Sequence, residues 1–369
     1  MPSFDLAIYG PLAGPLYAGD DAGPTGGAEL QLFLLARGLA RRGLRIAHIV
    51  SHAERLPPVV DGVRLIHLPL RTRGQGRLSY ALRILQSLAH ADANIYLQRT
   101  VSFETGLVGL YARLRSRPFI FSVASQFTLP PRQDCSLLTK SAYRLGLACA
   151  DEIVTQTQQQ SAAVEQLLGR RATLIPSISQ PVAPACGSRS YFLWIGGLID
   201  FKGPLEYLQL AERVPEACFV MVAAERGPQW AALADAVRRR AQALRNVYLL
   251  QARPRAQLLP LYERAVAVVN TSRFEGFPNV FLEGWARGAR ALSLHVDPDG
   301  LLVQHGLGYC ANGSLDGLAR AASEMWARRD TDGPARAAAR AYVKRRHDEE
   351  RVVAQWAQLL RRVAEGWAA

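Results

Sequence analysis

The sequence has few of the residues that build disulfide frameworks or metal centres. Its 369 residues include five cysteines and seven histidines. The number of cysteines is odd and none of them is spaced as C-x-x-C, which argues against both a disulfide framework and a zinc site. The histidines are scattered along the chain and form no cluster of metal-ligand spacing. Internal repeats and low-complexity tracts are also lacking.

Long apolar runs are missing as well. No stretch reaches the roughly 18 apolar residues that a membrane-spanning helix needs. The first ten residues, MPSFDLAIYG, lead directly into a strand pattern rather than into a charged and then apolar leader. Together with a hydrophobic content of 49%, these features predict a cytoplasmic globular enzyme. A chain of this length is too long for one ordinary core, so we expect about two domains.

Acidic residues are outnumbered, with 31 against 44 lysines and arginines and a net charge of +13. The excess suggests an anionic partner. Zinc-finger, RNP and homeodomain patterns are absent, as is a basic stretch interleaved with aromatics, so we expect no nucleic acid. An anionic membrane surface on the inner face fits better, although a solvated arginine-rich surface explains the charge equally well. The arginines concerned fall into two groups: Arg37, Arg41, Arg42 and Arg45, and Arg64, Arg71, Arg73, Arg77 and Arg83.

Strand-like runs alternate with amphipathic helical patterns along the whole chain, which is typical of parallel α/β sheets. A first series ends before residues 176–190 (PSISQPVAPACGSRS), a segment without periodicity that is rich in Pro and Ser and reads as a linker. The strands of this series are expected in FDLAIYG, RIAHIV, VRLIHL, ANIYLQ, PFIFSVA, EIVTQT and ATLIP.

A second series follows the linker, with strands expected in YFLWIGG, CFVMVAA, VYLLQA, VAVVN and RALSLHV. We therefore predict an N-terminal Rossmann-like domain at residues 1–178 and a C-terminal one at 179–346. Residues 347–369 form one more helix with an apolar face. Two such domains facing each other would bind ligands at the carboxyl ends of their strands.

The most informative segment is 271–288 (TSRFEGFPNVFLEGWARG), which holds two glutamates around a Gly-Phe-Pro-Asn turn. It follows a buried strand pattern and leads into a helix whose expected first position is Pro278. Glu275 thus lies on the loop and Glu283 inside the helix. Between them, the backbone N–H groups of Asn279 and Val280 lie at the positive end of the helix dipole, which suits a phosphate group. One carboxylate could bind hydroxyls on one side of that phosphate and the other could bind hydroxyls on its far side. A nucleotide sugar has this layout of hexose, diphosphate and ribose.

This segment resembles the hallmark of the retaining family-4 glycosyltransferases, two glutamates separated by seven residues around a G-F-P-N turn. The resemblance implies a GT-B fold, in which a C-terminal helix crosses back to the first domain. It extends along most of the chain, through Gly26-Gly27-Ala28-Glu29, Gln98-Arg99, Gly196-Gly197 and Lys202-Gly203.

The resemblance also implies roles for single residues in donor binding. Glu275 would bind hydroxyls of the donor sugar and Glu283 the ribose, while Gly276 and Phe277 offer backbone N–H groups to the sugar. Lys202 lies at a helix start that disfavours a cation unless an anion is also present, so it predicts a diphosphate contact. Further donor contacts are expected from Gly26, Gly27 and Gly196, and from Pro278, Asn279 and Val280.

Two departures from the family pattern stand out. The arginine that usually follows the first glycine is Gly197 here, and Arg273 or Arg99 are the candidates to replace it. The histidine that usually contacts the sugar is replaced by Ser125-Gln126, with Asp134 as a candidate substitute. Arg99 can alternatively bind acceptor phosphate or pair with a neighbouring acid.

The predicted activity is therefore transfer of a hexose, with retention, from a nucleoside-diphosphate sugar to an acceptor hydroxyl. The expected acceptor is a lipid-linked oligosaccharide of cell-surface polysaccharide synthesis. Asp297-Pro298-Asp299 spells D-x-D, but a proline-centred turn explains it better, and the family needs no divalent metal, so we expect no cofactor. Two alternatives remain: a nucleotide-sugar epimerase, and a non-catalytic sugar-nucleotide binding subunit.

Overall fold

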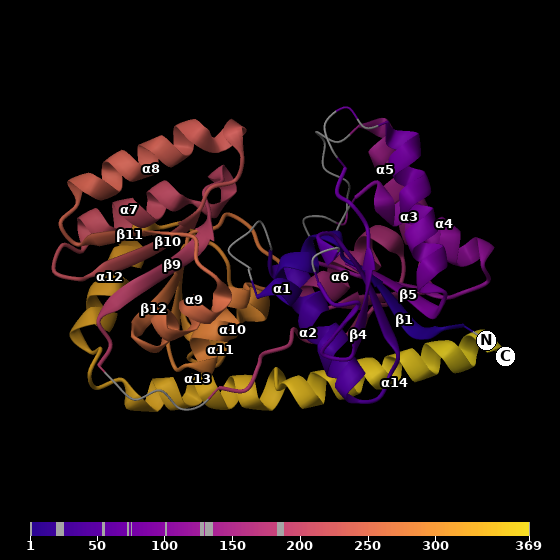
Figure 1. The fold of residues 1–369 in the computed structure, drawn as a ribbon. Coiled ribbons are helices and arrows are strands. Elements are labelled where there is room, and N and C mark those ends of the chain that lie inside the picture. The colour runs from indigo at the N-terminus through magenta and orange to yellow at the C-terminus, as the bar shows by residue number, and fades with distance from the viewer. Residues whose placement is uncertain are drawn as a thin grey trace. The chain divides into compact units, whose positions relative to one another are not determined.

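The computed structural model describes residues 2–19, 26–53, 56–71, 74, 76–99, 102–125, 129, 136–182 and 188–368. The described chain forms two compact α/β units, drawn in Figure 1. Unit 1 contains residues up to 178 together with the C-terminal residues from 349 onward, and unit 2 contains residues 179–348. The division falls inside the Pro- and Ser-rich segment 176–190.

Unit 1 is built on a sheet in the order β3-β4-β2-β1-β5-β6-β7-β8, parallel except for the short edge strand β3. Apolar residues dominate the central strands because both faces of the sheet are covered by helices. The strands are β1 (Phe4–Tyr9), β2 (Ile46–Val50), β3 (Val59–Val60), β4 (Val63–His67), β5 (Ala93–Arg99), β6 (Phe119–Ser122), β7 (Glu152–Thr155) and β8 (Thr173–Leu174).

Two helical layers cover this sheet. One face carries α1 (Gly14–Ala18), α2 (Gly27–Arg41) and the C-terminal α14 (Glu349–Ala368), which share one apolar core. The other face carries α3 (Arg77–Ala91), α4 (Glu104–Leu114), α5 (Leu137–Cys149) and α6 (Gln158–Leu168), which share a second core. The last helix of the chain is therefore part of unit 1.

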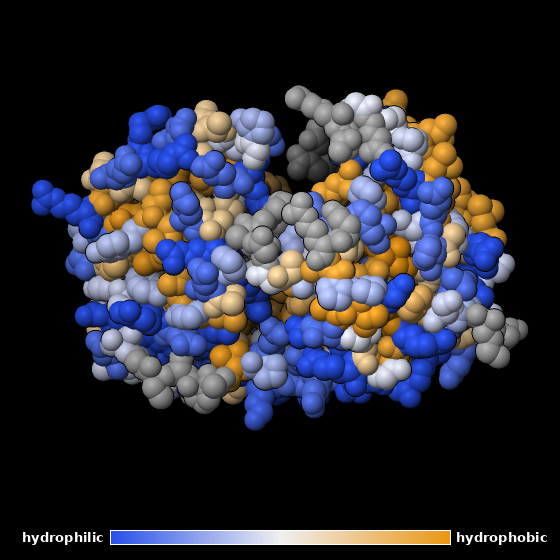
Figure 2. Space-filling view, in the orientation of Figure 1, coloured by the Kyte–Doolittle hydropathy of each residue, from blue (hydrophilic) through white to orange (hydrophobic). Residues whose placement is uncertain are grey.

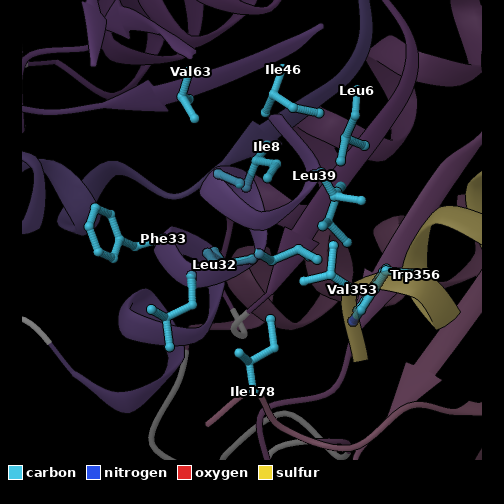
Figure 3. Close-up of a cluster of buried hydrophobic side chains, with 14 of the residues drawn as sticks. Leu6, Ile8, Leu32, Phe33, Leu39, Ile46, Val63, Ile178, Val353 and Trp356 are labelled. Atoms are coloured by element: carbon cyan, nitrogen blue, oxygen red, sulfur yellow. The ribbon is translucent and has the colours of Figure 1, made fainter. Parts of the chain in front are cut away.

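Close contact between α2 and α14 depends on a glycine. A Cβ on Gly38 would lie 2.5 Å from a methyl group of Val353, so only glycine lets the two helices approach this closely. Figure 3 shows Val353 and Trp356 of α14 beside Leu39 of α2. Gln31 of α2 binds the backbone of Ile178, where this part of unit 1 ends. Its side chain donates to the carbonyl of Ile178 (3.0 Å) and accepts from the N–H of Ile178 (2.6 Å).

Unit 2 has a fully parallel sheet in the order β11-β10-β9-β12-β13-β14, with helices on both faces. Its strands are β9 (Tyr191–Gly197), β10 (Phe219–Ala224), β11 (Val247–Gln251), β12 (Ala265–Asn270), β13 (Arg290–Ser293) and β14 (Gly308–Cys310). Its α-helices are α7 (Pro204–Arg213), α8 (Ala231–Ala243), α9 (Arg255–Glu263), α10 (Asn279–Ala286), α11 (Leu301–Gln304), α12 (Leu315–Ala327) and α13 (Gly333–Arg346).

The predicted fold class is confirmed: two Rossmann-like units of parallel strands and helices, with a C-terminal helix that packs in the first unit. All twelve predicted strands are present, and β3 and β14, which have two and three residues, were not predicted. Across the described ranges, no helix combines the length and the apolar character that crossing a membrane requires.

Candidate functional site

The candidate site of unit 2 begins where β9 and β12 end. These strands are neighbours and parallel, so the loops that follow them meet at the same edge of the sheet. The side chain of Thr271 joins the two loops: its hydroxyl accepts from the indole N–H of Trp194 (3.0 Å) and lies 2.8 and 2.7 Å from the carbonyl oxygens of Lys202 and Gly203. The lysine and the glutamate segment are thus held in fixed register.

Lys202 and Glu275, 73 residues apart in sequence, form an ion pair at this edge. The hydroxyl of Ser272 donates to the same carboxylate oxygen at 2.8 Å. The side chains of Lys202 and Glu275 are 25% and 18% exposed, so the pair is largely shielded from water yet open to a ligand. An anionic ligand would compete with Glu275 for the ammonium group of Lys202.

Two stacked aromatic rings lie beside Lys202. Phe201 and Phe274 stack with their centroids 4.8 Å apart, and the ammonium group of Lys202 lies 5.4 Å from the centroid of Phe201. Arg273, a candidate to replace the missing arginine, is bound elsewhere. It pairs with Asp200 at 3.1 Å and with Glu206 at 3.9 Å, and its side chain is exposed.

The second glutamate also has a basic partner. Arg255, at the start of α9, donates from Nε to Glu283 at 2.8 Å and from Nη1 to Gln180 at 2.7 Å. Tyr262 is buried beside this pair, and its pKa is raised well above the ordinary value, chiefly by burial and further by the charge of Glu283. Glu283 is therefore oriented by its own cation, in a pair separate from that of Lys202 and Glu275.

The helix between the glutamates starts one residue later than expected. Pro278 is the cap rather than the first helical residue, because its ψ of 114° is extended, and α10 begins at Asn279. Asn279 and Val280 occupy the first two positions of α10, where backbone N–H groups point toward the N-terminal end of the helix. The ring of Phe277 is buried against Trp285, so only the backbone of that residue and of Gly276 is suited to a ligand contact.

The glycine pair at the end of β9 makes room for two larger side chains. A Cβ on Gly196 would lie 2.8 Å from the ring of Trp194, and one on Gly197 would lie 2.8 Å from Nε of Arg226. Arg226 follows β10, the neighbour of β9, and its side chain passes directly over Gly197. Arg226 thus lies over the residue at which the family pattern has an arginine.

Arg226 and Arg255 were not predicted from the sequence. Each lies just after a strand, β10 or β11, so a search of the cations at strand ends would have found them. Nothing in the sequence singles them out from the other arginines of the chain, because their contacts with Gly197 and Glu283 are set by tertiary packing.

Predicted residues of unit 1 lie apart from this cluster in the chain. Gly26 caps α2, its N–H donating to Glu29 at 3.0 Å, and Gly27 is the first helical residue. Arg99 is buried and donates to the side chain of Gln156 at 2.6 Å. Burial lowers the pKa of this guanidinium to about 10. Asp134 and Gln126 fall outside the described residues, and Ser125 lies within them.

The D-x-D sequence has a structural task. Asp297 accepts a hydrogen bond from the N–H of Leu302 in the first turn of α11 at 2.9 Å, while burial raises the pKa of its carboxyl. Pro298 and Asp299 form the turn before that helix. Within the described ranges, no three residues of His, Cys, Asp or Glu are placed to hold a metal ion.

Comparison with known proteins identifies the two units. Residues 26–177 match the family described as "Glycosyl transferase 4-like domain", and residues 189–328 match "Glycosyl transferases group 1". No curated protein matches the sequence at a significant level.

Several solved structures share the fold over nearly the whole chain. Sucrose-phosphate synthase from Thermosynechococcus elongatus has a TM-score of 0.79 and 16% identity, covering 98% of this chain and 100% of its own. HepE from Anabaena, in complex with UDP and glucose, has a TM-score of 0.75 and 17% identity, covering 97% and 99%. WaaG, a glycosyltransferase involved in lipopolysaccharide biosynthesis, has a TM-score of 0.68 and 15% identity, covering 96% and 99%. The chain therefore belongs to the family-4 glycosyltransferases with a GT-B fold.

Proposed function

We propose that the protein transfers a hexose from a nucleoside-diphosphate sugar to an acceptor hydroxyl, with unit 2 holding the donor. The observation that carries this proposal is the ion pair of Lys202 and Glu275 at the shared edge of β9 and β12, next to the start of α10. In this proposal the lysine binds the diphosphate, and the carboxylate beside it binds the sugar hydroxyls. HepE, which has the same fold, was solved with UDP and with UDP-glucose.

The chemistry would depend on stabilising charge rather than on an enzymic nucleophile. As the bond between sugar and diphosphate breaks, negative charge grows on the leaving phosphate. Lys202, Arg226 and the backbone N–H groups at the start of α10 would offset that charge, and their fixed positions avoid reorganisation during the reaction. Lys202 would exchange Glu275 for the diphosphate when the donor binds, which frees Glu275 to accept hydrogen bonds from sugar hydroxyls.

Retention and metal independence are part of the same proposal. With no nucleophile assigned, the acceptor attacks from the face that the diphosphate leaves, and the diphosphate takes up the acceptor's proton. Two side-chain cations and a helix N-terminus supply the positive charge that a divalent ion provides in other phosphate sites. Activity should therefore persist with excess EDTA, whereas strict dependence on manganese or magnesium would contradict this part.

For the acceptor, we propose a lipid-linked oligosaccharide of cell-surface polysaccharide synthesis, reached at the inner face of the membrane. The net charge of +13 supports an anionic surface as partner, and WaaG, of similar fold, is involved in lipopolysaccharide biosynthesis. Contacts to the acceptor from Arg99 and Asp134, and to the donor from Gly26 and Gly27, remain predictions for unit 1.

A donor screen followed by a product assay tests the proposed function. Thermal shift against UDP-, GDP-, TDP- and ADP-sugars should single out one nucleotide, since binding to the folded state raises the melting temperature. Mass detection should then find the free nucleoside diphosphate released from that donor. Binding without any release would favour the non-catalytic subunit, and an isomerised sugar nucleotide would favour the epimerase.

A further inference from the structure

The surface of unit 1 formed by α3, α4 and α5 is unusually apolar. Fourteen large apolar side chains are exposed in the described part of the chain, and half of them belong to these three helices. Figure 2 shows apolar surface among hydrophilic side chains on this side of unit 1. The residues are Leu78 and Leu82 on α3, Leu110 and Leu114 on α4, and Leu137, Leu138 and Leu145 on α5. An apolar patch of this kind marks an interaction surface.

On each of the three helices, the exposed leucines share the side that faces away from the core. Leu78 and Leu82 are four residues apart, as are Leu110 and Leu114, and Leu138 and Leu145 are seven apart, so each set lies on one side of its helix. The opposite sides of the helices carry buried residues such as Ile84, Val108 and Tyr143. Because α4 contacts both α3 and α5, the three exposed stripes belong to one continuous helical layer.

The charge around the leucines is almost wholly positive. Helices α3 and α5 contain no acidic residue, and α4 has only Glu104, in its first turn. Among the described residues, no carboxylate forms an ion pair with the exposed Arg77, Arg83, Arg115 or Arg144. Exposed cations around apolar side chains complement an anionic lipid surface, whose phosphates meet the cations while the apolar tips enter the boundary of the acyl chains.

A groove beside α3 extends this basic surface. It has a volume of about 470 Å³ and lies between α3 and β4. Arg64, His67, Arg83 and His90 are among the described residues that line it, and none of those residues is acidic. A phosphate-bearing head group matches this lining.

The other arginine group suggested by the sequence is differently placed. On α2 and after it, Arg37 pairs with Asp61 at 2.8 Å, Arg41 with Glu349, and Arg45 with Asp5 at 2.7 Å. These ion pairs engage three of the four arginines of this group within unit 1, and Arg42 donates to the backbone carbonyl of Glu350 at 2.9 Å. Of the second group, Arg77 and Arg83 lie on α3 and Arg64 lies on β4, while Arg73 falls outside the described residues. The structure thus favours the arginines beside the leucines.

We propose that unit 1 docks on an anionic membrane through the face of α3, α4 and α5, with the seven leucines in the lipid boundary. The inference rests on the membrane association proposed above and specifies its surface. It does not depend on the identity of the donor or on catalysis.

Vesicle flotation of the full chain tests this surface. The test variant carries Leu114→Gln, Leu137→Gln and Leu138→Gln, all at exposed positions where folding should be unaffected. The matched control is Val303→Gln, because Val303 is 73% exposed against 76% for Leu114 and lies on α11 of unit 2. With vesicles of phosphatidylcholine and 30% phosphatidylglycerol at low salt, we expect the triple variant to bind at least about tenfold more weakly and the control to bind like wild type.

The outcomes separate this inference from the enzymatic proposal. Equal vesicle binding by the triple variant and wild type would overturn the assigned face. Absence of wild-type binding, in a preparation that still binds its sugar nucleotide, would overturn the membrane partner while leaving the function intact. A dimer in sedimentation that the triple variant abolishes, without vesicle binding, would mean that a second copy covers the face. Retained sugar-nucleotide binding by the triple variant serves as the folding check.

Discussion

Lys202 and Glu275 form an ion pair that joins the loops after two neighbouring strands, held in place by Thr271 and Ser272. Both side chains are mostly buried, and each neutralises the charge of the other. An unpaired charge at this depth would destabilise the fold. In the proposed donor site, the diphosphate would offer Lys202 a more highly charged partner and would release Glu275 toward the sugar.

Loss of Lys202 should weaken the binding of every ligand that contains the diphosphate. For Lys202→Ala we expect the affinities for the sugar nucleotide and for the free nucleoside diphosphate to fall together, by about 10- to 100-fold, because a charge-assisted hydrogen bond is lost. Lys344→Ala, at an exposed position on α13, is the matched control and should bind both ligands normally. Unchanged nucleotide affinity in a calorimetric titration of Lys202→Ala would remove the lysine from the site.

Arg226 should contribute to the same phosphate contact. We expect Arg226→Ala to lower the affinity for the nucleoside diphosphate by about tenfold or more. Gly197→Ala should have a similar effect, since its new methyl group would collide with Arg226 and displace it. Gly333→Ala, where a Cβ meets no atom within 4 Å, is the control. If both site variants bind the nucleotide like wild type, the arginine has no part in donor binding.

The sequence predicted the sheets and the glutamate segment because both depend on local patterns. Buried parallel strands appear as apolar runs, and the segment around the start of α10 has one glutamate before its Gly-Phe-Pro-Asn turn and one after it, in fixed spacing. The partners of those glutamates could not be predicted in this way. Arg226 covers Gly197 only because β10 lies beside β9 in the folded sheet, and Arg255 meets Glu283 only because α9 packs against α10.

The close approach of α2 and α14 predicts a stability effect at Gly38. Gly38→Ala should lower the free energy of unfolding by about 1 to 3 kcal/mol, because the stiff side chain of Val353 leaves no room for the methyl group. Gly366→Ala, on α14 with no atom within 4 Å, should instead be neutral or stabilising by up to about 1 kcal/mol. Urea unfolding measures both.

A double variant decides whether Val353 is the cause. In Gly38→Ala with Val353→Ala, the loss should be smaller than the sum of the two single losses, since the overlap is gone. Additive losses would show that the two residues do not interact.

His48 predicts how stability depends on pH. The ring is fully buried, its Nδ1 lies 2.7 Å from the hydroxyl oxygen of Tyr17, and burial lowers its pKa to about 3 from an ordinary 6.5. Between these values the unfolded chain binds a proton that the folded chain does not, so stability falls as the pH drops below 6.5. From pH 7 to pH 5 this histidine should cost about 2 kcal/mol.

Comparison with His48→Gln isolates this contribution from that of other titrating groups. The free energy of unfolding of the variant should fall by about 2 kcal/mol less than that of wild type between pH 7 and pH 5. Parallel pH dependences in the two proteins would show that His48 does not titrate on unfolding as proposed.

Titration calorimetry of Glu275→Ala and Glu283→Ala, each with the sugar nucleotide and with the nucleoside diphosphate alone, tests the assigned donor site most directly. Glu275→Ala should lose about 10- to 100-fold in affinity for the sugar nucleotide and little for the free nucleotide, while Glu283→Ala should lose similarly for both, because the ribose is common to them. Circular dichroism must first show that both variants fold. Equal losses for the two ligands in Glu275→Ala, or unchanged nucleotide affinity in Glu283→Ala, would contradict the account.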